Sequence, residues 1–76
     1  MTPSTRGYSD DGERGLTPRM RDVLRSAAQG SSARETGREL HLSESTIKTV
    51  RAAACARLEA RNVTAAVAIA YRRGDL

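Results

Sequence analysis

Four residues of the type that begin helices divide the C-terminal four-fifths of this chain, and their spacing constrains the fold more than any other feature. Each is followed by apolar residues at helical spacing: Thr17, Ser32, Ser43 and Asn62. Side-chain oxygens of these residue types accept hydrogen bonds from the free amides of a first helical turn. We therefore predict an all-α fold with four helices, over residues 18–29, 33–41, 44–59 and 63–73.

Local patterns support these starting points. Pro18 falls at a first helical position, where the missing N–H costs nothing. Ser32 and Glu35 have the spacing of a capping box, in which each side chain bonds to the backbone amide of the other residue. Gly37 lies inside a predicted helix, where glycine costs about 1 kcal/mol relative to alanine. A close helix–helix approach would explain this glycine.

The 76 residues allow one domain with a small core. The chain has no Phe or Trp and two Tyr, so the core must be aliphatic. Helical spacing places the following residues on core-facing stripes: Leu16, Met20, Val23, Leu24, Ala27, Leu40, Ile47, Val50, Ala54, Leu58, Val63, Ala66, Val67, Ala70 and Tyr71. Residues 1–15 are rich in Gly, Ser, Thr, Pro and Asp, which predicts a flexible tail before a domain at 16–76.

The charge of the chain suits a polyanionic partner. The net charge is +4, and residues 16–76 hold eleven Arg or Lys against six Asp or Glu, which is +5. A solvated basic surface would explain the same numbers. The single cysteine, Cys55, excludes an internal disulfide and a cysteine-rich metal site, and His41 has no second ligand nearby, so no metal is expected. No signal peptide or membrane span is indicated, so the cytoplasm is the default location.

The two middle helices are separated by only a few residues, which is the layout of a helix-turn-helix. On the second of them, an apolar stripe faces the core. The opposite face carries Ser45, Lys48, Thr49 and Ala52. Small hydroxyl side chains and a lysine on an exposed helix face are typical of a surface that inspects DNA.

The chain resembles the DNA-binding domain of LuxR-type (GerE- or FixJ-type) transcription regulators. The resemblance rests on an ordered set of segments: Leu16–Leu24 (LTPRMRDVL), Gly30 with Ser32, Glu35 and Leu40, Leu42–Lys48 (LSESTIK), Arg57–Leu58, and Asn62–Val67. It implies that residues 44–59 lie in the major groove and that the last helix forms a homodimer. The sequence departs from the family pattern at Met20, Thr36, Gly37, Val50 and Ala54, which thins the core and the polar contacts.

The resemblance implies roles for particular residues. Base contacts map to Lys48, Thr49 and Ala52. Phosphate contacts map to Ser32, Arg34, Ser43, Ser45 and Thr46, to which Arg51 is added because it flanks the proposed reading face. The last helix is apolar on both sides, and its expected dimer surface consists of Val63, Ala66, Val67, Ile69 and Ala70.

These observations predict a sequence-specific, double-stranded DNA-binding transcription regulator that needs no cofactor. Family members usually carry a large control domain before this region, whereas 15 residues precede Leu16, so we expect a stand-alone protein or an excised domain. The alternative is a protein-interaction module that acts on RNA polymerase, a sigma factor or another regulator. RNA polymerase is also a candidate partner of a DNA-bound regulator. An enzyme is not expected, because the sequence has no nucleophile–base set and no glycine-rich phosphate loop.

Overall fold

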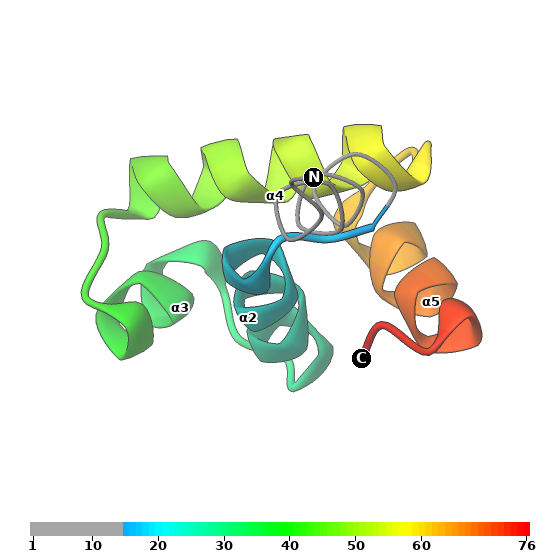
Figure 1. Cartoon of the computed structure of the whole chain (residues 1–76). Coiled ribbons are helices and arrows are strands. Elements are labelled where there is room, and N and C mark those ends of the chain that lie inside the picture. Colours follow the sequence, from blue (N-terminus) through cyan, green and yellow to red (C-terminus); the bar gives the residue numbers. More distant parts are fainter. Residues whose placement is uncertain (1–14) are drawn as a thin grey trace, which may run out of the picture.

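The computed structural model describes residues 15–76, and this part of the chain holds four α-helices and no strand (Figure 1). The helices are α2 (Pro18–Ala28), α3 (Ala33–Leu40), α4 (Glu44–Leu58) and α5 (Val63–Arg73). The all-α prediction is confirmed, and the expected ranges overrun three helices by one residue at the C-terminal end. The expected tail at 1–15 lies outside the described residues, apart from Gly15.

The four predicted helix starts are confirmed. At Thr17, Ser32, Ser43 and Asn62, a side-chain oxygen accepts a hydrogen bond from the backbone amide three residues later, over 2.8–3.1 Å. At Ser32 the capping box is complete, because Glu35 Oε1 accepts a bond from the Ser32 amide at 2.8 Å. Local hydrogen bonds therefore fix all four starting points.

The helices surround two neighbouring apolar clusters. Helix α4 contacts the other three helices, and α2 lies between α3 and α5 and contacts both (Figure 1). One cluster joins α2, the C-terminal half of α4, and α5: Leu16, Met20, Leu24, Ala54, Leu58, Ala66 and Ala70. The other joins α2, α3 and the start of α4: Val23, Ala33 and Ile47, with Leu40, Leu42 and Val50 packed against it. Helix α2 is thus shared by both halves of the molecule.

One core prediction holds only in part and another is wrong. Leu40, expected as the main core residue of its helix, is only partly buried, whereas Ala33, Thr36 and Gly37 form the buried face of α3. Tyr71, expected on the buried stripe of the last helix, is 57% exposed. Leu40 packs at the edge of the second cluster, whereas Ala66 and Ala70 fill the core side of α5 and the larger Tyr71 stays at the surface.

Gly37 makes a close approach, but its neighbour is the turn and not another helix. A β-carbon built at Gly37 would lie 2.5 Å from the Leu42 carbonyl oxygen, well inside van der Waals contact. The backbone after α3 can therefore fold back directly over this position. None of the helices within residues 15–76 has both the length and the apolar character needed to cross a membrane.

Candidate nucleic-acid interface

Helices α3 and α4 are joined by a tight turn whose geometry is held by local bonds. His41 ends α3 in the left-handed region, with φ 61° and ψ 42°. The Leu42 amide then donates to the Gly37 carbonyl oxygen at 2.8 Å, and Ser43 caps α4 directly afterwards. The turn is therefore short and defined, as a helix-turn-helix requires.

The predicted reading face lies on the outside of α4. Ser45, Lys48, Thr49 and Ala52 are all exposed. On the opposite side of the same helix, Ile47, Ala54 and Leu58 are between 0% and 6% exposed. The buried stripe holds α4 against the rest of the domain, and its polar face is left open along its first half.

Among residues 15–76, the polar contacts of the reading face lie within α4. Lys48 Nζ lies 3.4 Å from Glu44 Oε2, with the two side chains 67% and 48% exposed. Thr49 Oγ1 donates to the Ser45 carbonyl oxygen at 3.2 Å. An exposed pair of this kind contributes less than about 1 kcal/mol, so a ligand can recruit Lys48 at small cost.

The expected phosphate-contact residues gather at two helix N-termini. Ser32 and Arg34 are exposed at the start of α3, and Ser43, Ser45 and Thr46 are exposed at the start of α4. The Ser43 hydroxyl accepts from the Thr46 amide at 3.0 Å and donates to Thr46 Oγ1 at 2.9 Å. Helix N-termini attract anions because their amides and dipole point outward.

Arg51, by contrast, is taken up by the fold. Its Nη2 donates to the Ser31 carbonyl oxygen at 3.0 Å. Its Nε is buried and has no hydrogen-bond partner among the described residues. The side chain therefore lies along the protein surface toward the loop between α2 and α3. The expected phosphate contact at Arg51 stays a prediction, and it would compete with this bond.

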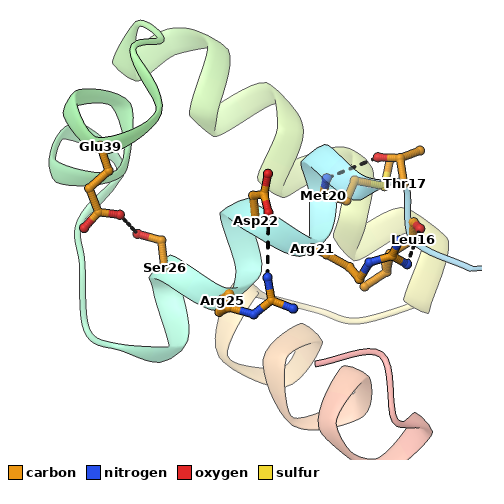
Figure 2. A network of polar contacts seen from close by, with 8 residues as sticks. All are labelled: Leu16, Thr17, Met20, Arg21, Asp22, Arg25, Ser26 and Glu39. Atoms are coloured by element: carbon orange, nitrogen blue, oxygen red, sulfur yellow. Dashed lines mark hydrogen bonds and ion pairs between the residues drawn. The ribbon is translucent and has the colours of Figure 1, made fainter.

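A hydroxyl–carboxylate network between α2 and α3 was not anticipated. Ser26 Oγ lies 2.7 Å from Thr36 Oγ1 and donates to Glu39 Oε1 at 2.8 Å (Figure 2 draws the Ser26–Glu39 bond). Ser26 and Thr36 are buried, at 5% and 0% exposed. Thr36 at a core position was the one sequence signal for a buried polar contact, but its partner lies ten residues away. The network fixes α3 on α2.

The N-terminus of α3 also lowers the pKa of one acidic residue, Glu35. The hydrogen bond from the Ser32 backbone amide, and then the Ser32 hydroxyl, hold the pKa of the Glu35 carboxyl below its usual value of 4.5, and Arg38 adds to the effect. The carboxylate therefore stays charged at the N-terminus of α3, where it caps the helix.

The expected dimer surface on α5 is reduced. Ala66 and Ala70 are 0% exposed because they pack into the chain's own core against α2 and α4, so no partner can reach them. Val63, Val67 and Ile69 are partly exposed and also pack at the edge of that core. Ala68 and Tyr71 are exposed on the outer side of α5.

The chain is similar to known bacterial regulatory proteins. The sequence matches the GerE family model, described as bacterial regulatory proteins of the luxR family, over residues 14–70. It is also similar to the transcriptional activator protein BjaR1 of Bradyrhizobium diazoefficiens, with 47% identity over 57 residues. That alignment covers 75% of this chain and 24% of the relative, so the chain spans about a quarter of the relative's length.

Proposed function

The chain belongs to the luxR family of bacterial regulatory proteins, and from that premise we propose that it regulates transcription by reading double-stranded DNA with α4 in the major groove. The observation that carries this proposal is the exposed face of α4, with Lys48 and Thr49 at its centre, opposite the buried Ile47, Ala54 and Leu58. A helix held in this way can enter a groove without disturbing the core.

The proposed phosphate and base contacts follow from the chemistry of the side chains. Ser32, Arg34 and Ser43, with Ser45 and Thr46, hold phosphate oxygens at the two helix N-termini and thereby set the register of α4. Lys48 and Thr49 then offer donors to base edges, while Ala52 offers a methyl group to a thymine methyl. With so few polar groups on the face, we expect a short recognition sequence.

We also propose that two copies bind together through α5. Apolar side chains available on this helix are the partly exposed Val63, Val67 and Ile69 and the exposed Ala68 and Tyr71, next to the exposed Thr64 and Arg72. A two-fold dimer would place two copies of α4 about one DNA turn apart, roughly 34 Å.

Selection from a random double-stranded DNA library at near-physiological salt tests the proposed function. Enrichment of an inverted repeat is the expected result and would identify the operator. Enrichment of a single half-site would support DNA reading but overturn the dimer. No enrichment would reject sequence-specific binding and favour a protein-interaction module that acts on RNA polymerase, a sigma factor or another regulator.

A further inference from the structure

Arg51 connects the reading helix to the loop that precedes α3. The residue lies in the second turn of α4, three positions after Lys48. Its bond to the Ser31 carbonyl oxygen, 3.0 Å long, spans twenty residues of sequence. Because its Nε is also buried, the guanidinium cannot swing outward without giving up this bond and the packing of its stem.

Ser31, the residue that Arg51 holds, is bonded to three helices. Its amide donates to the Ser26 carbonyl oxygen in α2 at 3.2 Å. Its hydroxyl donates to Glu39 Oε2 in α3 at 3.5 Å. Its carbonyl oxygen accepts the bond from Arg51 in α4. The next residue is Ser32, the N-cap of α3, so a shift of Ser31 moves the start of α3.

We propose that Arg51 is a positioning residue for DNA binding: it sets the spacing between the α4 reading face and the N-terminus of α3, and it does not contact phosphate itself. This inference rests on the proposed function. Phosphate contacts fix the register of a protein on the duplex, and the phosphates are held at fixed positions by the DNA. The two helix N-termini can bind their phosphates together only if their separation matches that of the DNA.

The guanidinium suits this role better than an ammonium would. It is planar, always charged and offers directed donors at the end of a stem that packs along the protein. A lysine at the same position would keep the positive charge while losing the fixed direction of the bond. Charge and geometry can therefore be separated experimentally.

The test compares Arg51→Met and Arg51→Lys with Arg34→Met, which removes an exposed arginine proposed to bind phosphate directly. Affinity is measured at several salt concentrations on a short duplex that carries the site enriched from the random library. Hydrogen exchange of the backbone amides of residues 30–33 is measured on the free protein, with the amide of Leu24 in the core as the folding control.

We expect Arg51→Met to weaken DNA binding about tenfold with an unchanged slope of log affinity against log salt, since no phosphate contact is lost. Arg34→Met should flatten that slope by about 0.9, the value of one phosphate contact. The amides of residues 30–33 should exchange faster in Arg51→Met and, to a smaller degree, in Arg51→Lys, and the affinities should follow the same order.

A flattened slope in Arg51→Met with unchanged exchange would overturn the proposal and make Arg51 a phosphate contact. Unchanged affinity in Arg51→Met would also overturn it. If the wild-type protein bound no DNA, the proposed function itself would fail. Faster exchange of residues 30–33 in Arg51→Met would then still support the link between α4 and the loop, so the two failures are distinguishable.

Discussion

Gly37 illustrates how a single missing β-carbon controls the shape of the helix-turn-helix. Intrinsic helix propensity favours alanine over glycine by about 1 kcal/mol at this position, because it lies within α3. The added carbon would however meet the Leu42 carbonyl oxygen at 2.5 Å, and that backbone atom is fixed by the turn. The steric cost outweighs the gain in helix propensity.

We predict that Gly37→Ala lowers the free energy of unfolding by about 1–3 kcal/mol, the usual cost of overpacking. Urea denaturation followed by circular dichroism measures this change. Arg38→Ala is the matched control, because Arg38 is the next residue of the same helix and is exposed. A Gly37→Ala protein as stable as the wild type would show that the turn can relax at no cost.

In the proposed mechanism, Lys48 is a central base-contacting residue. Its exposed pair with Glu44 adds little to folding, so Lys48→Ala should leave stability within about 0.5 kcal/mol of the wild type. The same change should weaken binding to the selected site by about 1–3 kcal/mol, and binding to random DNA by less. Competition between the two duplexes measures the difference, and equal losses on both would show that the reading face is misassigned.

At the scale of elements, the contact between α2 and α3 depends on a directed chain of hydroxyl groups. Ser26 has a single hydroxyl hydrogen, which it donates to Glu39, so Thr36 must be the donor in the 2.7 Å contact with Ser26. Loss of Ser26 therefore leaves the buried Thr36 hydroxyl without an acceptor in this network. Loss of the Thr36 hydroxyl still leaves Ser26 bonded to Glu39.

This asymmetry gives a prediction that a double-mutant cycle can measure. Ser26→Ala should destabilise the protein by about 1–3 kcal/mol, the usual cost of a stranded buried group, and Thr36→Val by less. The double variant should be more stable than the sum of the two single losses implies. Additive losses in urea denaturation would mean that the hydroxyls do not interact.

The Glu35 carboxylate at the N-terminus of α3 should make the stability of the fold depend on pH. The pKa of Glu35 is lowered in the folded protein, so its stabilising effect is complete above the usual value of 4.5 and is lost as the pH falls through the lower folded value. Glu35→Gln keeps an acceptor for the Ser32 amide but removes the charge. The gap in urea midpoint between wild type and Glu35→Gln should therefore be constant near neutral pH and close below pH 4.5. A gap that widens in acid would contradict this assignment.

The helix starts could be predicted from the sequence because each depends on residues within three positions of one another, as at Ser32 and Glu35. Contacts between elements could not. The bond from Arg51 to Ser31 spans twenty residues, and the one from Ser26 to Glu39 spans thirteen. Neither pair leaves a periodic signal, because each depends on how two helices pack.

Across the whole molecule, the two apolar clusters give the halves of the domain different tasks. The cluster of Val23, Ala33 and Ile47 supports the helix-turn-helix, and the larger cluster supports α5. Helix α2 joins them, and Arg57 Nη1 of α4 bonds the Gly15 carbonyl oxygen at 3.0 Å, which holds the segment leading into α2. The apolar pattern of α5 predicts a covered surface on both of its sides, whereas in the structure one side packs into the core and Ala68 and Tyr71 are exposed. The helical spacing placed Ala66 and Ala70 on the core-facing stripe, where the structure has them, but it could not show that Tyr71 of the same stripe stays exposed.

This division predicts that dimer formation and DNA reading can be separated. Ala68 is exposed on the outer side of α5, away from the buried Ala66 and Ala70, so Ala68→Arg should leave the fold intact. In a two-fold dimer the new charge would meet its own copy or an apolar surface, which opposes association.

We therefore expect Ala68→Arg to bind a single half-site as well as the wild type but to lose at least about 1.4 kcal/mol, or tenfold, on the full inverted repeat. Gel-shift titration measures the affinity of each protein for both duplexes, and the single half-site is the control for the full repeat. Equal affinity of Ala68→Arg and wild type for the full repeat would show that α5 does not join two copies. An equal loss on both duplexes would indicate a damaged fold, which thermal unfolding would reveal. The reading face lies on the first half of α4, whereas α5 packs against the second half. A change at Ala68 can therefore depend on the number of half-sites only if a second copy is bound.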